Sequence, residues 1–340
     1  MAETAAATTR MLEEVRQSAD AVARQLAANR DLVADLAAFL RASPPSLVAT
    51  GARGSSDNAA TFARYLVETR LGIPTASAAP SVQSVYAAGP RMDGTLFLAI
   101  SQSGRSPDLV AQARGARRAG AHVVALVNVA DSPLAEEADR VLPLHAGPEL
   151  SVAATKSFLC SLSALLDLVA AWRGDEAARA ALEALPDVLA APATGDWSPL
   201  VDGLVDARSL FVVGRGFGLA AAQEVALKCK ETCGLHAEAF SAAEVQHGPM
   251  TLVERGFPVL FFVQDDDTRA STLEVARRFR ERGARVWIAG EDLPVAASPD
   301  PACTPLLAVH RCYAAINALA LRRGRDPDSP PHLRKVTETH

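Results

Sequence analysis

One block of this sequence recurs later in the chain, and that internal repeat constrains the fold more than any other feature. Residues 120–125 match residues 283–288 at an offset of 163 residues, and the same offset carries Gly51 onto Gly214 and 96–100 onto 259–263. Strand-like segments that recur in one register indicate two copies of one structural unit. A chain of 340 residues with 49% hydrophobic content can build two sizeable cores.

Each copy has the order strand, glycine turn, long helix, strand, helix, strand. The segments 96–100 and 259–263 are apolar without alternation, which is typical of a parallel sheet buried on both faces. We therefore expect an α/β fold with two tandem domains, each a parallel sheet flanked by helices in a flavodoxin-like three-layer αβα sandwich. Ligands of such sheets bind at the carboxyl ends of the strands.

The sequence also predicts where these units begin and end. We expect two short N-terminal helices within 1–45, a first domain at 46–180, a second at 200–321 and a C-terminal tail at 322–340. Residues 181–198 contain the prolines and glycine typical of an interdomain connection. The tail is polar and rich in proline, and its composition alone favours a frayed end.

A serine-rich loop follows the apolar strand of the first copy. Ser101, Gln102, Ser103 and Ser106 come directly after that strand, and Pro107 is suited to the first position of a helix capped by Ser106. Backbone N–H groups and the helix dipole would then face the hydroxyls, an arrangement that suits a phosphate dianion. Serine-rich turns are also common as plain caps and loops, but the strand context favours a phosphate site.

The second copy lacks this chemistry. At the repeat offset, residues 264–267 align with the serine loop and contain three consecutive aspartates. Because carboxylates repel a phosphate, we expect one phosphate pocket per chain, in the first half.

A second group of polar residues lies on the helix expected after Gly214. Glu224, Lys228 and Glu231 have i, i+4, i+7 spacing and project from one helix face. A solvated ladder of salt bridges is the ordinary interpretation of such a stripe. Its neighbours along the helix are mostly apolar, so we expect these three side chains to face an enclosed pocket.

Charge, hydropathy and cysteine usage exclude several classes of function. A net charge of −5 does not favour binding to nucleic acid or to an anionic membrane, which both require a positively charged surface. With no apolar run of membrane-spanning length and no leader pattern after Met1, the sequence predicts a cytoplasmic protein. Cys229, Cys233 and His236 have helical spacing that could suggest a metal site, but buried packing thiols are favoured and no metal is expected.

Several motifs in order carry a family resemblance. These are the segments 51–58, 100–104, 152–157, 237–240 and 247–249. Together they resemble the sugar isomerase (SIS) family, and the match covers nearly all of the chain after the N-terminal helices. Within that family the chain is most similar to the glucosamine-6-phosphate deaminases, and it also resembles the isomerase half of glucosamine-6-phosphate synthase.

The resemblance implies a site for a phosphosugar. The residues that it places around the phosphate and the sugar are Ser56, Ser101, Gln102, Ser103, Ser106, Val152 and Ala154. Ala154 stands where the synthase pattern has a serine, so one hydrogen bond to the sugar is absent or replaced.

The resemblance also implies roles for the charged residues. Glu231 would move a proton between C1 and C2 of the open-chain sugar, with Glu224 and Lys228 positioning the oxygen functions. His247 would open the sugar ring in the pocket of a neighbouring subunit, which requires a homodimer. The C-terminal tail would lie over the substrate, so that Lys335 would contact the carbonyl or amine group of the substrate.

The expected function is deamination of glucosamine 6-phosphate to fructose 6-phosphate and ammonia, without a metal or redox cofactor. The alternatives are deamination of galactosamine 6-phosphate and plain ketose/aldose isomerisation, as of tagatose 6-phosphate. The synthase reaction needs a glutaminase domain with an N-terminal cysteine, and no cysteine precedes Cys160.

Two further readings belong to other classes of protein. A module that only senses phosphosugars usually carries a helix-turn-helix domain, for which the segment before the first strand is too short. A dinucleotide-dependent dehydrogenase is suggested by Gly214, Gly216 and Gly218, but Leu219 breaks that fingerprint.

Overall fold

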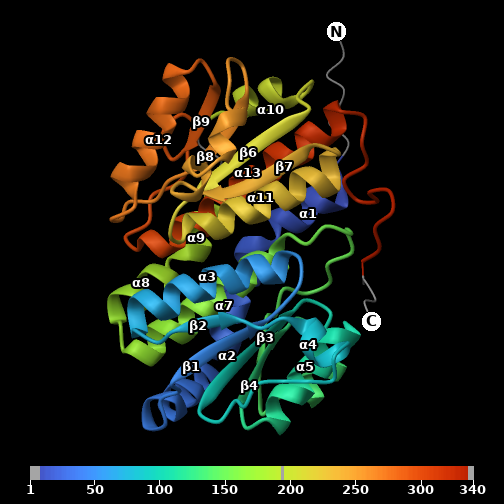
Figure 1. Cartoon of the computed structure of the whole chain (residues 1–340), viewed down its shortest axis with the longest axis vertical. Helices are drawn as coiled ribbons and strands as arrows, with labels where there is room; N and C mark the ends of the chain where they lie inside the picture. The colour runs from blue at the N-terminus through green and yellow to red at the C-terminus, as the bar shows by residue number, and fades with distance from the viewer. Residues whose placement is uncertain (1–7, 193–194, 336–340) are drawn as a thin grey trace.

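The chain forms two parallel β-sheets with helices between and outside them (Figure 1). The structure is a computed structural model, and it describes residues 8–192 and 195–335. The first sheet has the order β2-β1-β3-β4-β5 and the second β7-β6-β8-β9. The strands are β1 (Leu47–Gly51), β2 (Thr75–Ser77), β3 (Thr95–Ser101), β4 (His122–Val127), β5 (Arg140–Pro143), β6 (Ser209–Gly214), β7 (His236–Ser241), β8 (Pro258–Phe262) and β9 (Arg285–Ala289).

Helices make up most of the remaining described chain. The α-helices are α1 (Arg10–Arg16), α2 (Ser18–Ala42), α3 (Ser55–Leu71), α4 (Pro80–Ser84), α5 (Pro107–Arg118), α6 (Pro133–Glu136), α7 (Lys156–Arg173), α8 (Glu176–Glu183), α9 (Leu185–Ala190), α10 (Ser198–Leu204), α11 (Gly218–Cys233), α12 (Arg269–Glu281) and α13 (Thr304–Arg322). The short 3₁₀ helices are η1 (Glu244–Gln246), η2 (Pro249–Leu252) and η3 (Pro301–Cys303). Within the described residues, no helix is long and apolar enough to cross a membrane.

The internal repeat is confirmed by the positions of these elements. α3 and α11 begin at Ser55 and Gly218, which are 163 residues apart, and β4 and β9 begin at His122 and Arg285, at the same offset. Every strand pair in both sheets is parallel. The expected α/β class and parallel sheets are therefore confirmed, while the exact domain boundaries stay a prediction.

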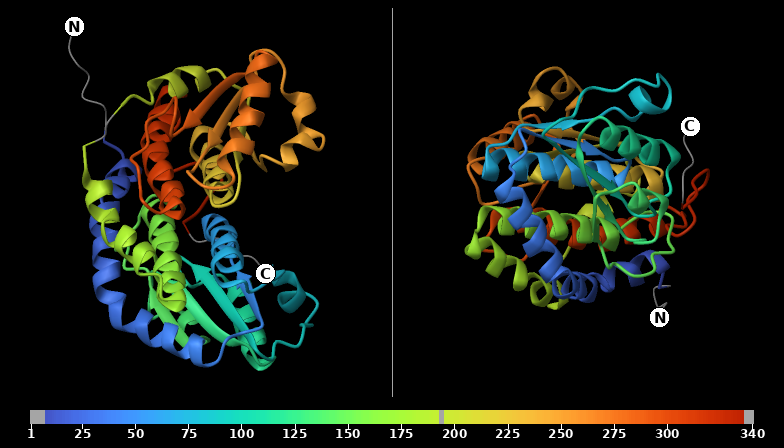
Figure 2. Two further views of the ribbon diagram at one scale, coloured as in Figure 1. Left: turned by 90° about the vertical axis from the view of Figure 1, so that its left-hand side faces the viewer. Right: turned by 90° about the horizontal axis from the view of Figure 1, so that it is seen from below.

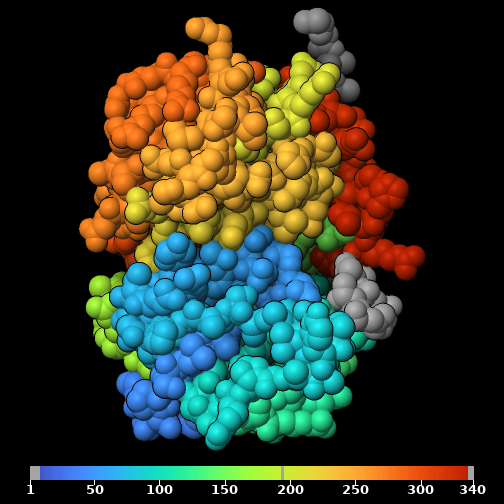
Figure 3. Space-filling view, in the orientation of Figure 1, coloured from blue at the N-terminus to red at the C-terminus, as the bar shows by residue number. Residues whose placement is uncertain are grey.

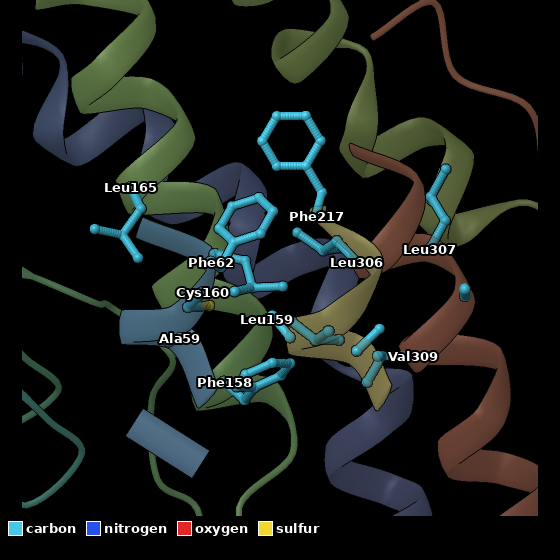
Figure 4. Close-up of a cluster of buried hydrophobic side chains, with 14 of the residues drawn as sticks. Ala59, Phe62, Phe158, Leu159, Cys160, Leu165, Phe217, Leu306, Leu307 and Val309 are labelled. Atoms are coloured by element: carbon cyan, nitrogen blue, oxygen red, sulfur yellow. The ribbon is translucent and has the colours of Figure 1, made fainter. Parts of the chain in front are cut away.

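The two halves share one core, which the expectation of two separate cores missed. Its side chains come from α3 and α7 of the first half and from the start of α11 and α13 of the second (Figure 4). Phe62 and Phe217 lie across the junction with ring centroids 5.9 Å apart. Smaller clusters cover the outer face of each sheet. The shared core is built because helices of both halves bury their apolar faces against one another.

The N-terminal helices differ from the expected pair of short helices. α1 has seven residues and packs against α13, whereas α2 has 25 residues and packs against α7. Figure 2 shows α2 running along the outside of the first half, with α1 reaching the second half. The N-terminal segment therefore connects the halves instead of covering only one.

The segment expected as an interdomain connection is largely helical. α8 and α9 occupy most of 176–190, and Pro186 takes the second position of α9. Proline is tolerated in the first turn of a helix because the N–H it lacks has no intrahelical partner there. Pro186 therefore marks a helix start, and the segment between the two sheets is helical at these residues.

Residues 323–335 follow an ordered path, in contrast to the frayed tail favoured by composition. Asp328 accepts hydrogen bonds from the backbone N–H groups of Arg10 and Met11, each at 2.8 Å. Its own carbonyl accepts from the N–H of Val152 at 3.3 Å. The segment descends along the side of the molecule from α13 toward the first half (Figure 3). The last expected tail residues, 336–340, lie outside the described residues, as do 1–7 of the N-terminal segment.

Candidate active site

A cavity of about 320 Å³ opens at the carboxyl ends of β1 and β3, where the two halves and the C-terminal segment meet. The sequence-predicted residues that line it are Ser56, Ser101, Gln102, Ser103, Ser106, Val152, Ala154, Lys228, Glu231 and Lys335. Glu224 and His247 are the two predicted residues that do not line it. Another cavity, of about 170 Å³ beside α4 and α5, is lined without charged side chains and lies away from these residues.

The loop after β3 is folded so that its polar groups face the cavity. Ser101 Oγ accepts the N–H of Gly104 at 3.0 Å, and Ser103 Oγ accepts the N–H of Arg105 at 3.3 Å. Gly104 has a φ of 63°, and a Cβ there would lie 2.1 Å from Ser132 Oγ. Only glycine fits this turn, which brings the serines to the start of α5.

Ser106 is the residue before α5, and Pro107 occupies the first helical turn, as the sequence predicted. Ser106 is the N-cap residue of α5, which confirms the prediction, and its hydroxyl makes no capping hydrogen bond within the helix. The residue is only partly buried and lines the cavity. Its hydroxyl is therefore available to a ligand, beside the N–H groups of a helix N-terminus.

The turn after β1 leads into Ser55, a residue of the motif at 51–58. Ser55, the first residue of α3, donates a hydrogen bond to Glu224 Oε1 at 3.2 Å and accepts one from Lys228 Nζ at 3.1 Å. Ser55 also lines the cavity. Its position between Ser56 and the charged face of α11 joins the first half to the second.

The three charged residues of α11 share one face, as predicted, but differ in burial. Lys228 Nζ forms an ion pair with Glu231 and lies 3.6 Å from Glu224 Oε1. The side chains of Glu224 and Lys228 are 0% and 1% exposed, whereas that of Glu231 is 23% exposed. Burial alone would lower the pKa of Lys228, but the two carboxylates outweigh it and raise the pKa, which keeps the ammonium charged.

Glu224 lies beneath the cavity and does not line it, so the expected positioning of the sugar oxygens by this residue would have to be indirect. Its carboxylate accepts from Asn58 Nδ2 at 2.9 Å and from the Tyr313 hydroxyl at 2.8 Å, besides Ser55. Burial is the main cause of its raised pKa, and the nearby Lys228 ammonium opposes the shift. With its acceptors engaged by protein groups, Glu224 can act on a ligand only through Ser55 and Lys228.

Lys335 reaches the cavity and is held there by a buried carboxylate. Its Nζ donates to Glu149 Oε2 at 3.1 Å and to the carbonyl of Ser151 at 2.8 Å. Glu149 also accepts from Ser157 Oγ at 2.6 Å and from the N–H groups of Thr155 and Ser157, each at 3.0 Å. Burial would raise the pKa of Glu149, but the charge of Lys335 and these hydrogen bonds together lower it.

His247 lies away from this cavity. It follows η1 in the second half, and its side chain is exposed. The short helices η1 and η2 place it in a surface turn together with Gly248. The geometry within one chain therefore does not bring His247 to Glu231.

The second half closes the position equivalent to the serine loop. Gln264 is 2% exposed, and its Nε2 donates to the carbonyl of Arg215 at 2.7 Å and to Asp266 Oδ2 at 3.0 Å. The other oxygen of Asp266 accepts from the Thr268 N–H at 2.8 Å. These side chains occupy the loop mouth where the first half offers hydroxyls, which supports the expectation of one phosphate pocket per chain.

The cysteines follow the packing interpretation. All five are free and buried, among them Cys229 and Cys233 of the suggested metal motif. Burial raises the pKa of the Cys233 thiol to about 11, so it is protonated at neutral pH. In the described part of the chain, no group of three or more potential ligands could hold a metal ion.

Sequence reasoning missed several residues that shape the site. They are Arg53, Asn58, Glu149, Tyr313 and Arg334. Arg53 and Asn58 belong to the motif at 51–58, and proximity to Ser56 could have identified them. Tyr313 lies 89 residues from Glu224, and no local pattern in the sequence indicates that contact.

Comparisons with known proteins identify the family. The model of the SIS domain matches residues 43–171 and 203–291. A glutamine–fructose-6-phosphate aminotransferase (isomerizing) from Methanothermobacter thermautotrophicus is 35% identical over 296 residues, which are 83% of this chain and 50% of the relative. The chain thus spans about half the length of the curated relatives that it matches.

Solved structures give the same result. A candidate phosphosugar isomerase from Silicibacter pomeroyi DSS-3 is 47% identical, with a TM-score of 0.90 over 94% of this chain and 100% of that one. Glucosamine-6-phosphate deaminase from Thermotoga maritima shares the fold at 23% identity, with a TM-score of 0.78 over 97% of this chain and 100% of the other. The matched segments contain both repeat units, and this chain belongs to the SIS-domain family.

Proposed function

We propose that this protein is a phosphosugar aldose–ketose isomerase that deaminates glucosamine 6-phosphate to fructose 6-phosphate and ammonia. One observation carries the proposal, namely that a single cavity joins the serine loop of the first half to Lys228 and Glu231 of the second. The serine loop suits a phosphate, and the ion pair suits proton transfer at the other end of a sugar. The relatives named for fructose-6-phosphate chemistry and the phosphosugar isomerase neighbour support it.

The proposed reaction begins with the open-chain sugar held by its phosphate. Glu231 removes the proton from C2 and delivers it to C1, while a proton of the C2 ammonium group passes to the C1 oxygen, so that the C1 aldehyde becomes a hydroxymethyl group and C2 an iminium ion. Water then adds to C2, ammonia leaves, and the C2 ketone of fructose 6-phosphate remains. A single carboxylate beside both carbons serves these transfers. Lys228, held charged between two carboxylates, orients the oxygen at C1.

We propose that Lys335 contacts the carbonyl or amine end of the substrate. Its side chain lines the cavity, and its ammonium is anchored by Glu149. The three side chains Lys228, Glu231 and Lys335 then surround C1 and C2.

Ring opening is assigned to His247 of a neighbouring subunit. The side chain is exposed and does not line the cavity of its own chain, so it is free to enter the site of a second copy. Under this proposal the active unit is a homodimer, with one incomplete site in each isolated chain.

Galactosamine 6-phosphate and tagatose 6-phosphate are the competing substrates within the same chemistry. A sensing module remains the alternative from another class, but it would not need the Lys228–Glu231 pair at the cavity surface. The buried network behind that pair is costly to desolvate unless every member is satisfied. Its retention at a cavity favours catalysis.

The test is turnover by the purified protein of glucosamine 6-phosphate, galactosamine 6-phosphate, tagatose 6-phosphate, and fructose 6-phosphate with ammonia. We expect ammonia and ketose to appear in equal amounts from glucosamine 6-phosphate. A Glu231→Gln variant prepared in parallel controls for contaminating activity. Absence of turnover for every amino sugar phosphate would overturn the deaminase assignment, and isomerisation of tagatose 6-phosphate alone would replace it.

A further inference from the structure

The phosphate end of the cavity contains one charged side chain that the motif-based assignment did not include. Among the described residues of the first half that line the cavity, up to Leu109, Arg53 is the single charged one, because the others are serines, Gln102 and apolar residues. Hydroxyls and amides alone leave the charge of a phosphate dianion uncompensated. A guanidinium at this position would change the ligand that the site prefers.

The contacts of Arg53 leave part of its guanidinium available. Its Nε and Nη2 both donate to the same oxygen, Asp108 Oδ2, at 3.1 and 2.8 Å. Asp108 therefore engages two of the three nitrogens, and Nη1 remains for another acceptor. The Arg53 side chain is 50% exposed, whereas that of Asp108 is 2% exposed. The buried carboxylate thus fixes a guanidinium that still faces the open cavity.

Phosphate binding beside Asp108 requires a positive charge close to that carboxylate. Asp108 lies in the first turn of α5, two residues after Ser106, and its other oxygen accepts the N–H of Leu109 at 2.9 Å. A buried carboxylate beside a phosphate subsite repels the ligand by Coulomb's law. Asp57 adds a second carboxylate in the first turn of α3, within range of Arg53. Arg53 is the cation that can offset both.

We propose that Arg53 is a phosphate-binding and specificity-determining residue. It neutralises Asp108 and uses Nη1 to bind a phosphate oxygen, so that the cavity selects dianionic phosphate esters over neutral sugars. The inference deepens the proposed function and rests on it, since it concerns the same cavity. The two hydrogen bonds to Asp108 Oδ2 fix the guanidinium before the ligand arrives, which reduces the entropy lost on binding.

The test measures binding by calorimetry, with fructose 6-phosphate, inorganic phosphate and fructose as the three probes. Arg53→Gln should weaken binding of both phosphate probes by about 10- to 100-fold, the usual effect of losing a hydrogen bond to a charged group, and leave binding of fructose unchanged. Arg53→Lys should retain part of the affinity for the phosphate probes, because lysine keeps the positive charge but lacks the planar set of N–H donors of the guanidinium. The matched control is Arg64→Gln, which removes an exposed arginine of α3, the helix that follows the Arg53 turn.

Asp108 variants separate this role from a structural one. If Arg53 offsets Asp108, then Asp108→Asn should bind the phosphate probes at least as tightly as wild type, and Arg53→Gln/Asp108→Asn should regain affinity relative to Arg53→Gln. If Arg53 only braces Asp108, Asp108→Asn and Arg53→Gln would weaken binding equally and lower the unfolding temperature together, and the proposal would be overturned.

The outcome can be distinguished from failure of the proposed function. Binding of fructose 6-phosphate does not require turnover, so a wild-type protein that binds it but deaminates nothing still tests Arg53. Unchanged phosphate affinity in Arg53→Gln, alongside normal deamination by wild type, would overturn the role of Arg53 alone. A wild-type protein that binds no phosphate probe would overturn both.

Discussion

Burial sets the chemistry of individual residues at this site. Glu149 is fully buried, yet it remains ionised because Lys335 and three hydrogen bonds from Thr155 and Ser157 compensate the lost hydration. Glu231 is the most exposed carboxylate of the α11 stripe and the one that lines the cavity. A proton-transfer group must meet the substrate, whereas a buried carboxylate can only position other groups. The roles that we propose for Glu224 and Glu231 rest on this difference in exposure.

The Glu149–Lys335 pair predicts a pH-dependent effect of Lys335→Met. In wild type the pKa of Glu149 is lowered, so the pair stabilises the fold above the pKa of the unfolded state, and that stabilisation is lost as pH falls through the folded pKa. Without Lys335, burial dominates and disfavours the charged carboxylate. We expect the variant to lose about 1–3 kcal/mol near pH 7, with the difference shrinking toward pH 4.

Denaturant unfolding of both proteins at several pH values measures this effect. Lys230→Met, which removes an exposed lysine of α11, is the control for loss of one positive charge. A difference between wild type and Lys335→Met that stayed constant from pH 7 to pH 4 would show that Lys335 does not control the ionisation of Glu149.

At the scale of elements, the site depends on how α3, α11 and the C-terminal segment meet. The N-terminus of α3 lies against the middle of α11, where Ser55 contacts both Glu224 and Lys228. The segment 323–335 is fixed at Asp328 by the first turn of α1 and at Lys335 by Glu149. A helix of one half, a helix of the other and a terminal segment are therefore all required to form the cavity.

Asp328→Ala tests whether the contact with α1 holds the segment in place. Asp328 accepts two N–H groups at the start of α1 that have no intrahelical partner, so its removal should cost about 1–2 kcal/mol of unfolding free energy. We also expect a lower kcat, since Lys335 is displaced along with the segment. Exposed Glu254→Ala is the control. Normal stability with normal kcat would mean that Asp328 does not anchor the segment.

The elements that sequence could predict are those with a local signal. The 163-residue repeat and the apolar strands predicted both sheets, and the i, i+4, i+7 spacing placed three charged residues on one face of α11. The path of 323–335 could not be predicted, because its prolines and charges resemble a frayed end and its partners Arg10, Met11 and Glu149 lie far away in the sequence. Tyr313 was missed for the same reason, and Pro186 suggested a linker where a helix begins.

At the scale of the whole molecule, the two halves form one structure, and each contributes different residues to the cavity. They share a core, and the serine loop of the first half lines the cavity, whereas Gln264 and Asp266 bond to one another in the equivalent loop of the second half. The second half contributes Lys228 and Glu231 instead. The two copies of one structural unit thus contribute different residues to a single cavity, whose proposed phosphate end lies in the first half and whose proposed reactive end lies in the second.

The homodimer proposal predicts rescue between two inactive variants. His247→Ala and Glu231→Gln should each be inactive alone, but a mixture in which subunits exchange contains hybrid dimers with one site that has both groups intact. We expect partial recovery of deaminase activity, up to about one quarter of wild type for random exchange of a symmetric dimer with one group from each subunit. Exchange is verified first with differently tagged subunits, and no rescue after proven exchange would place both groups in the site of one chain.

The central claim is that Glu231 transfers the proton between C2 and C1 from within this composite cavity. Its most direct test is the exchange of that proton, followed by NMR with glucosamine 6-phosphate deuterated at C2, in wild type and in Glu231→Gln, Glu224→Gln and Lys335→Ala. The account predicts that Glu231→Gln binds substrate with little change but loses the deuterium from C2 about 10²- to 10⁴-fold more slowly. The claim would be contradicted if Glu231→Gln lost the C2 deuterium at the wild-type rate while Glu224→Gln or Lys335→Ala did not lose it. The base would then be assigned to another residue.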